Sequence, residues 1–396
     1  MPTFIGVGFS KERDPFTASR DATLLAKLQL KQEKIDLILV FTSIRYADDE
    51  IIRGIIQVVE DSSIIGCSSA GLILSEGVEK EGVLILALKS TEIRFGLGLC
   101  EDIISGQERL CGNEVARTAI KNFASYKRHL FMLISDGLIK NSSELIMGVQ
   151  EILGKSFPLI GGASSDNLSF SKTYQYFQNR VLTNSAAGIL WGGDMSFGLG
   201  IKHGWRPLGK PRIATDTEGN IIKKIDHHPA IRIYEEYFGK DTQDLHSNKL
   251  ASMAILYPLG IYIAGEKEYL LRNALGVTPE GGLICQGEVP IDSEIRLMIG
   301  NKESCLKAAK EAAIEAKETI HNKETLLVMV FDSISRRKLL GRDAAKEIDV
   351  IKEVFGETVP IVGFYTFGEE APLKALDYRG QTYFHNETIA ILAIAK

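Results

Sequence analysis

The sequence lacks the features that mark secreted and membrane-spanning proteins. Its five cysteines are odd in number, widely spaced and never in a C-x-x-C pair. That pattern argues against a disulfide framework or a zinc knuckle, and it predicts reduced, mostly buried thiols. The longest uncharged run, residues 250–265, is too short to cross a bilayer and contains Pro258 and Gly260. Charged residues begin at Lys11, so no signal peptide is indicated, and we expect a cytoplasmic protein without a membrane partner.

A basic surface is missing as well. The 396 residues include 46 Lys and Arg against 51 Asp and Glu, which gives a net charge of -5. Proteins that bind a phosphate backbone usually carry a clustered excess of basic residues. Nucleic acid is therefore not an expected partner.

The patterns that identify common catalytic and cofactor sites are incomplete. P-loop spacing occurs at residues 204–210, but Pro211 follows where a Mg²⁺-binding Ser or Thr is needed, and no G-x-G-x-x-G is present. Ser68 resembles the nucleophile of an elbow motif, yet Ala70 stands where that motif requires glycine. The one adjacent pair of histidines would point to opposite faces of an extended chain. We expect no enzymatic activity, no catalytic residue and no metal site.

What the chain does contain is an internal repeat. Strand, helix, strand, helix, strand and strand recur in that order over residues 4–88, 95–190 and 295–392. The strands are continuous apolar runs, and the helices have one apolar face. This combination predicts an α/β fold of mixed sheets covered by helices, built from repeated β-α-β-α-β-β units.

In each copy an apolar strand is expected to terminate in a glycine followed by small or polar residues. These glycines are Gly66, Gly161 and Gly363. Ligands of α/β proteins usually bind at the carboxyl ends of strands, so the three loops are candidate sites. The alternative is that the glycines only make tight turns.

A stretch rich in Pro, Gly, Asp and Lys, residues 205–239, interrupts the repeat. We place a domain boundary there, between residues 225 and 226. Trp205 lies between a glycine and a nearby proline, on a stiff loop, and is predicted to pack one domain on the other.

Several segments together resemble the FIST family of sensory proteins. In the N-terminal part they are IGCSSAG at 65–71, FPLIGGA at 157–163 and HGWRPLG at 203–209. In the C-terminal part they are Pro229 with Ala230, Tyr234, YPLG at 257–260, Arg272, SRRKLLG at 335–341, PIVGFYTFGE at 360–369 and FHN at 384–386. The resemblance implies a FIST N-terminal-like domain of two repeat units at 1–225. A FIST C-terminal-like domain of one unit plus extra strands would occupy 226–396.

The resemblance implies a sensor of small ligands, with amino acids or related metabolites suggested. Signalling would pass to a separate protein partner such as a histidine kinase or a cyclase. Because some members of the family are reported to bind haem, a haem-binding nitric oxide sensor is the alternative to a cofactor-free protein. An enzyme of unrecognised type is a further alternative. One departure is Ser333, which occupies a place where the family pattern commonly has Cys.

The chemistry of the C-terminal segments suits a polar metabolite. Arg336 can present a forked donor to a carboxylate, and Glu369 can accept an ammonium group. The alternative is a solvated helix start for Arg336 and a surface turn for Glu369. The residues that we expect to bind the ligand are Arg336, Glu369, Tyr365, Thr366, His385, Asn386 and Arg272.

Overall fold

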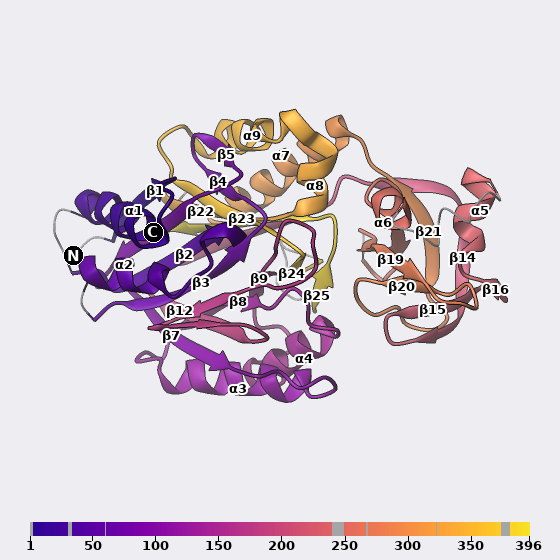
Figure 1. The fold of residues 1–396 in the computed structure, drawn as a ribbon, viewed down its shortest axis with the longest axis horizontal. Coiled ribbons are helices and arrows are strands. Elements are labelled where there is room, and N and C mark those ends of the chain that lie inside the picture. The colour runs from indigo at the N-terminus through magenta and orange to yellow at the C-terminus, as the bar shows by residue number, and fades with distance from the viewer. Residues whose placement is uncertain are drawn as a thin grey trace.

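The apolar strands and one-sided helices produce a mixed α/β structure, which we describe from a computed structural model (Figure 1). It describes residues 3–30, 34–59, 61–239, 249–266, 268–321, 323–373 and 381–396. A large body of three six-stranded sheets carries a smaller lobe on one side (Figure 1). Among the described residues, no helix is both long and apolar enough to span a bilayer.

The first sheet is formed mainly by the N-terminal segment. In spatial order its strands are β1 (Phe4–Ser10), β6 (Val83–Lys89), β2 (Leu37–Ser43), β3 (Ser63–Ser69), β10 (Gln175–Phe177) and β11 (Arg180–Leu182). Only β2 and β3 run parallel. Helices α1 (Pro15–Gln29) and α2 (Glu50–Val58) pack on this sheet, and η1 (Ile44–Tyr46) precedes α2. Asp14 begins α1 by accepting a 2.9 Å hydrogen bond from the backbone N–H of Thr17, a favourable N-cap.

The other two body sheets have the same pairing order. The second consists of β7 (Ile93–Cys100), β12 (Ala186–Gly193), β8 (Arg128–Ser135), β9 (Leu159–Ala163), β24 (Gly368–Pro372) and β25 (Thr382–His385), with α3 (Glu108–Lys121) and α4 (Ser142–Leu153). The third consists of β13 (Ser196–Lys202), β26 (Ile389–Ala395), β22 (Thr325–Ser333), β23 (Ile361–Thr366), β4 (Leu72–Leu74) and β5 (Gly77–Glu79), with α7 (Lys302–Thr319), α8 (Ile334–Leu340), η3 (Gly341–Asp343) and α9 (Ala345–Phe355). In each sheet one parallel pair lies beside antiparallel neighbours.

Each sheet borrows its last hairpin from another part of the chain. Strands β10 and β11 follow β9 in sequence but pair with β3. Strands β24 and β25 follow β23 but pair with β9, whereas β4 and β5 follow β3 but pair with β23. The three sheets are therefore interlocked, and no one of them is complete without a hairpin from outside its own segment.

The three glycines singled out in the sequence lie within strands rather than at turns. Gly66, Gly161 and Gly363 each sit opposite a residue of the neighbouring parallel strand. A Cβ at these positions would come within 1.7 to 2.0 Å of the facing backbone carbonyl oxygen. Close backbone approach, and not a tight turn, is what requires glycine here.

The third unit begins earlier than the sequence analysis placed it. Its first strand is β13, whereas residue 295, where the third repeat was predicted to start, lies in β21 (Glu294–Ile299) of the lobe. The lobe is inserted between β13 and α7. Its other elements are β14 (Arg206–Glu218), β15 (Ile221–Ile225), β16 (His228–Pro229), α5 (Arg232–Phe238), α6 (Lys249–Ala254), β17 (Leu259–Ile261), β18 (Leu270–Arg272), β19 (Ala274–Val277) and β20 (Leu283–Cys285).

The lobe has its own apolar core, which includes Tyr234, Leu259 and Leu297. The boundary predicted after residue 225 falls at the end of β15, inside the lobe (Figure 1). The division in space therefore differs from the predicted division along the chain. An insertion after the first strand of one unit leaves the pairing of that unit unchanged, because β13 still pairs with β26.

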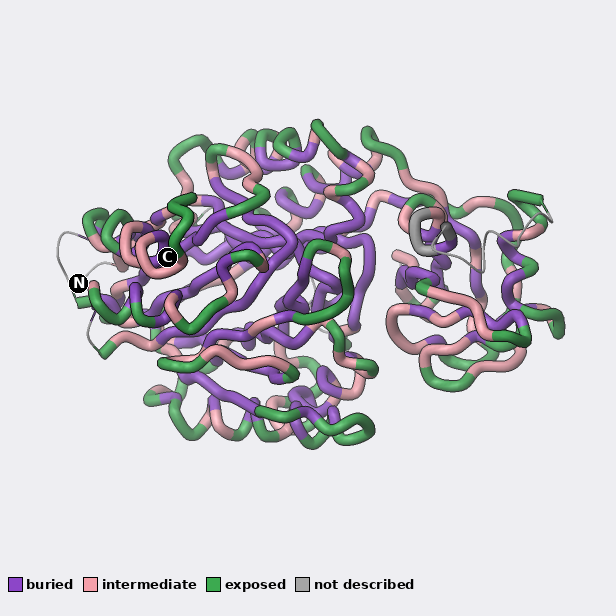
Figure 2. The backbone as a smooth tube through the Cα atoms, in the orientation of Figure 1, coloured by how far each residue is buried: buried purple, intermediate pink, exposed green. Residues whose placement is uncertain are grey.

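Burial is concentrated in the body sheets, and the exposed segments lie mainly in the outer helices and loops (Figure 2). The thiols differ from the prediction in one respect. Cys100 and Cys111 form a disulfide between the end of β7 and α3, with their Cα atoms 5.5 Å apart. Cys67, Cys285 and Cys305 are free and buried, as expected.

Candidate functional site: a cavity between body and lobe

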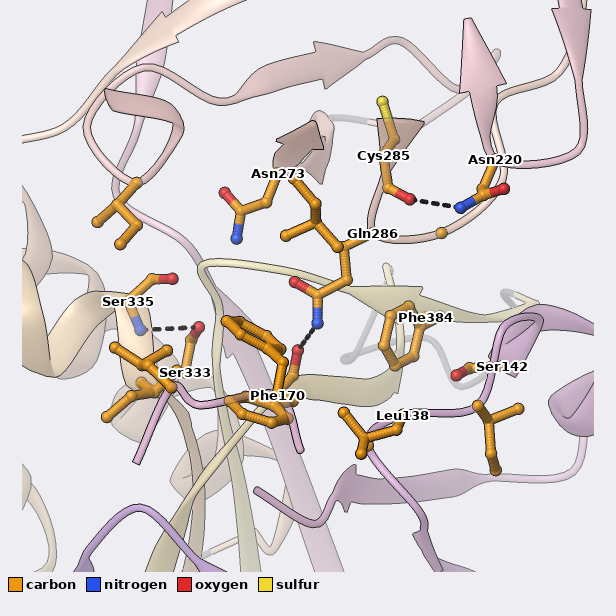
Figure 3. Close-up of a pocket in the computed structure, with 18 of the residues that line it drawn as sticks. Leu138, Ser142, Phe170, Asn220, Asn273, Cys285, Gln286, Ser333, Ser335 and Phe384 are labelled. Atoms are coloured by element: carbon orange, nitrogen blue, oxygen red, sulfur yellow. Dashed lines mark hydrogen bonds between the residues drawn. The ribbon is translucent and has the colours of Figure 1, made fainter. Parts of the chain in front are cut away.

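A cavity of about 770 Å³ lies where the lobe faces the body (Figure 3). Its lobe side is formed by Asn220, Ile255, Asn273, Leu275, Cys285, Gln286 and Gly287. Its body side is formed by Gly137, Leu138, Ile139, Lys140, Ser142, Leu168, Ser169, Phe170, Ser333, Ile334, Ser335, Lys338, Phe367 and Phe384. A cavity of this size is typical of small-molecule sites, and its lining mixes apolar side chains with polar and charged ones.

One body wall is a loop organised by Asp166. Its carboxylate accepts hydrogen bonds from the backbone N–H groups of Ser169 and Phe170 at 2.9 and 3.1 Å. Burial raises the pKa of Asp166, but the hydrogen bonds from Ser169, Ser171 and Phe170 outweigh it and lower the pKa overall. Phe170, at φ 48°, stacks on Phe367 with ring centroids 4.6 Å apart. A charged side chain thus holds an aromatic wall in place.

The lobe wall is tied to the body through side-chain amides. Gln286 donates from Nε2 to the carbonyl oxygen of Phe367, a contact visible in Figure 3. Asn220 donates to the carbonyl of Cys285 at 2.9 Å and so fixes the turn beside Gln286. The backbone N–H of Gln286 donates to the carbonyl of Asn273 at 2.8 Å. The cavity is therefore bounded on both sides by residues whose positions are fixed by hydrogen bonds.

The polar end of the cavity is formed by Asn273 and Ser335, with Glu387 directly behind them. All three are at least nine-tenths buried. Among the described residues, neither carboxylate oxygen of Glu387 nor Oδ1 of Asn273 has a hydrogen bond of regular geometry, but the Asn273 and Ser335 side chains lie close enough to Glu387 to favour its charged form. Burial raises the pKa of Glu387 to about 8, against the opposing influence of Asn273, Ser335 and Arg336. Glu387 also has a φ of 59°, which is uncommon outside glycine.

Arg336 has a different role from the predicted one. It is fully buried, and its Nε donates to Asp332 at 2.9 Å. Its two terminal nitrogens donate to Glu347 and to the backbone carbonyls of His203 and Cys305. Because the whole guanidinium fork is used inside the body, Arg336 does not present a donor to a ligand. It joins β22, α7, α8 and α9.

Glu369 and its neighbours are also interior. Glu369 is fully buried and accepts from the Thr366 hydroxyl and from the backbone N–H of Thr388. Thr366 also donates to the carbonyl of Asp332 at 3.1 Å. The Tyr365 ring lies 5.0 Å from the guanidinium carbon of Arg337. These contacts stabilise the junction of β22, β23 and β24, and Glu369 lies in a buried strand and not in a surface turn.

The other predicted residues lie just behind the cavity wall. His385 contacts the carbonyl of Ala371 at 2.8 Å, and Asn386 accepts from the backbone N–H of Asn273 at 3.2 Å. Arg272 donates to the carbonyl oxygens of Phe384 and Glu288, both at 2.9 Å. None of the seven predicted ligand residues lines the cavity. Three of them, however, are next in sequence to a residue of its polar end. Arg272 precedes Asn273, Asn386 precedes Glu387, and Arg336 follows Ser335.

The haem alternative can be examined at the same cavity. Haem iron needs an axial ligand such as His or a Cys thiolate. No histidine is among the described lining residues, and burial raises the pKa of the lining thiol Cys285 to about 12, which keeps it protonated. His246 lies outside the described residues. Over the part of the chain that the structure describes, no group of His, Cys, Asp and Glu side chains is arranged to hold a metal ion. The described lining does not fit haem.

A second buried carboxyl gives a prediction about pH. Glu370 accepts from the Ser135 hydroxyl at 2.7 Å, and burial raises its pKa from 4.5 to about 8 despite that bond. The folded state then holds a proton that the unfolded state has lost, so stability falls as pH rises from 4.5 to 8. We expect Glu370→Gln to reduce this fall. Between about pH 6 and pH 8, the free energy of unfolding of the variant should rise by about 1–2 kcal/mol relative to that of the parent. Urea unfolding at each pH measures the difference, and parallel curves for parent and variant would contradict the assignment.

Comparison with known proteins identifies the family. Residues 36–228 match the FIST N domain and residues 230–372 match the FIST C domain. The chain belongs to the FIST family. FIST domains are generally sensory domains in signalling. Ser333, where the family pattern commonly has Cys, lines the cavity of this FIST protein.

Relatives extend the match over nearly the full chain. An uncharacterized protein of Mycobacterium tuberculosis is 24% identical over 379 residues, which span 93% of this chain and 95% of that protein. An uncharacterized Mycobacterium bovis protein is 22% identical over 376 residues, or 93% of this chain and 94% of that protein. Two solved structures of cyanuric acid hydrolase, one from A. caulinodans, align over 100% of both chains at 10% and 8% identity, with TM-scores of 0.37 and 0.39.

Proposed function

We propose that this FIST protein is a small-ligand sensor in intracellular signal transduction. It binds an amino acid or a similar small metabolite in the cavity between body and lobe. The observation that carries the proposal is that residues of both parts line one cavity of about 770 Å³. A ligand there touches the lobe through residues such as Leu275 and the body through residues such as Phe367.

Signalling then follows from a change in how the lobe sits on the body. The lobe joins the body through two short connections, between β13 and β14 and between β21 and α7. A ligand shifts an equilibrium between two arrangements only by its differential affinity for them, and contacts on both sides of the cavity supply that difference. A separate partner, such as a histidine kinase or a cyclase, reads the new arrangement. The protein performs no turnover and needs no cofactor in this scheme.

The test is a thermal-shift screen of amino acids and small metabolites on the parent and on a cavity-blocking variant. A ligand that binds only the folded state raises stability by about 2.7 kcal/mol at one hundred times its Kd. We expect a hit with the parent and no shift with Leu275→Trp, which places an indole in the cavity. Leu28→Trp is the matched control, because Leu28 lies on α1 and is 70% exposed.

Hydrogen exchange gives the second reading of the same experiment. The hit should protect backbone amides at residues 273–287 of the lobe and 333–338 of the body together. If no compound shifts the parent, or if the shift persists in Leu275→Trp, the cavity is not the sensing site. Protection confined to one side of the cavity would contradict the signalling step.

A further inference from the structure

The polar end of the cavity contains buried hydrogen-bond acceptors that are poorly satisfied. Among the described residues, Oδ1 of Asn273 and both carboxylate oxygens of Glu387 have no hydrogen bond of regular geometry, although the Asn273 and Ser335 side chains lie close enough to Glu387 to act on its pKa. Asn273 is 6% exposed and Glu387 is fully buried. Buried polar groups are nearly always paired, since leaving one unpaired costs free energy, so the Asn273 oxygen on the cavity wall and the Glu387 carboxyl behind it need an explanation.

We propose that this end of the cavity binds the protonated amino group of a ligand, with Asn273 and Ser335 in contact with it and Glu387 supplying the negative charge. This inference rests on the proposed ligand-binding function and names the chemical group that is recognised. A primary ammonium brings three N–H donors and one positive charge, which match the unpaired acceptors and the carboxylate. A carboxylate head group brings only acceptors and would leave Oδ1 of Asn273 without a donor.

Aromatic and aliphatic residues elsewhere in the cavity suit an apolar body for that ligand. Phe170, Phe367, Phe384 and Leu275 line it, and the stacked rings of Phe170 and Phe367 offer a flat surface. The cationic side chains of the lining, Lys140 and Lys338, are both exposed. Apolar primary amines and apolar amino acids share the required ammonium group, and the probes below separate them.

Binding should release a proton. Glu387 has a pKa of about 8, so near neutral pH it carries a proton that leaves for the solvent when the ammonium arrives. The charged and titratable groups that influence Glu387 or feel its charge are Arg336, Glu369, Tyr234 and Cys305. Burial raises the pKa of Tyr234 well above 10 and that of Cys305 to about 12, so neither releases the proton near neutrality. Affinity for an ammonium ligand should therefore rise with pH up to about 8 and then level off.

Isothermal titration calorimetry with 2-phenylethylamine at about pH 6.5 tests the inference. Titrations in two buffers of different ionisation enthalpy give the number of protons released on binding, and we expect about one proton per ligand bound. Glu387→Gln should weaken binding by about tenfold or more and reduce proton release to near zero. Glu370→Gln is the matched control, because Glu370 is equally buried with a pKa of about 8 but contacts Ser135 and not the polar end of the cavity. It should keep both affinity and proton release. Glu369→Gln should also keep proton release, which assigns the proton to Glu387.

Three further probes decide between outcomes. Phenylalanine shows whether an adjacent carboxylate is accepted, and 2-phenylethanol and 3-phenylpropanoate replace the ammonium with a neutral and an anionic group. Suppose that 2-phenylethanol or 3-phenylpropanoate binds the parent but not Leu275→Trp, and that 2-phenylethylamine does not bind. The inference of an amino-group site is then wrong, but the proposal of a ligand-binding cavity is supported. If Glu387→Gln folds, as shown by an unchanged circular dichroism spectrum, and still releases a proton on binding the amine, the inference is also wrong. Failure of every probe together with the library screen removes both proposals.

Discussion

Replacing Arg336 by Ala should lower the free energy of unfolding by about 3–5 kcal/mol, because it leaves buried acids without their cationic partner. Asp332 and Glu347 are each at most 1% exposed and are both paired to this guanidinium. Two backbone carbonyls, those of His203 and Cys305, lose a donor as well. Chemical denaturation at pH 7 measures the loss.

The pH dependence of that loss separates charge from packing. Without Arg336, the acids Asp332 and Glu347 can stay in the interior only as neutral groups, and protonating them costs less at low pH. The deficit of Arg336→Ala should therefore shrink as pH falls. Arg53→Ala is the control, because the side chain of Arg53 is 71% exposed in its ion pair with Glu50, and it should change stability by less than about 1 kcal/mol. A deficit of similar size at pH 5 and pH 8 would show that the charges are not its cause.

Periodicity in the sequence predicted the fold class because each local signal reports on local packing. The helices expected within the repeats at 95–190 and 295–392 include α4 at Ser142–Leu153 and α7 at Lys302–Thr319. Continuous apolar strands such as β22 and β26 are buried along nearly their whole length, as expected for covered sheets. What local signals do not encode is which strand pairs with which. The exchange of hairpins between segments, seen in β4 pairing with β23, was therefore not predictable from periodicity.

The candidate site was approached in sequence but missed by one residue at three places. The prediction of Arg272, Asn386 and Arg336 rests on segments that resemble the FIST family, and for Arg336 also on its position directly after a buried strand. The structure uses their neighbours Asn273, Glu387 and Ser335 at the polar end of the cavity, and turns the selected side chains inward. Adjacent side chains of an extended chain face opposite ways, as for Arg272 and Asn273, whereas Ser335 and Arg336 are consecutive residues of helix α8 and differ by the turn of the helix. Glu387 carried no distinguishing signal, since its importance depends on burial and on a φ of 59°.

The lobe was hidden for a related reason. Its last strand, β21, ends two residues before α7 begins, so in sequence it resembles the first strand of the third unit. The first strand of the third unit in the structure is β13, which pairs with the C-terminal strand β26. The inserted lobe separates β13 from β21 by about one hundred residues. Nonlocal pairing decides between the two, and a single sequence does not show it.

Trp205 shows how lobe and body are held together, and removing it should have the other large effect. It is 4% exposed and packs with the lobe residues Leu271 and Met298. The body residues Cys305 and Leu340 belong to the same apolar cluster. Gly300 allows this contact, since a Cβ there would lie 2.4 Å from the indole ring. The indole is thus placed at the hinge through which we propose that the signal passes.

We expect Trp205→Ala to lower the free energy of unfolding by about 3–5 kcal/mol, the range for truncating a buried aromatic residue. The loss should fall on the docking of the lobe, so residues 206–299 should exchange amide hydrogens faster while the body sheets keep their protection. Trp191→Ala is the matched control, because Trp191 is fully buried within the body and packs edge-on against Phe95 at 5.1 Å. It should destabilise the body without selective exchange in the lobe. If Trp205→Ala leaves lobe protection unchanged while abolishing the thermal shift of a ligand, Trp205 contacts the ligand instead of anchoring the lobe.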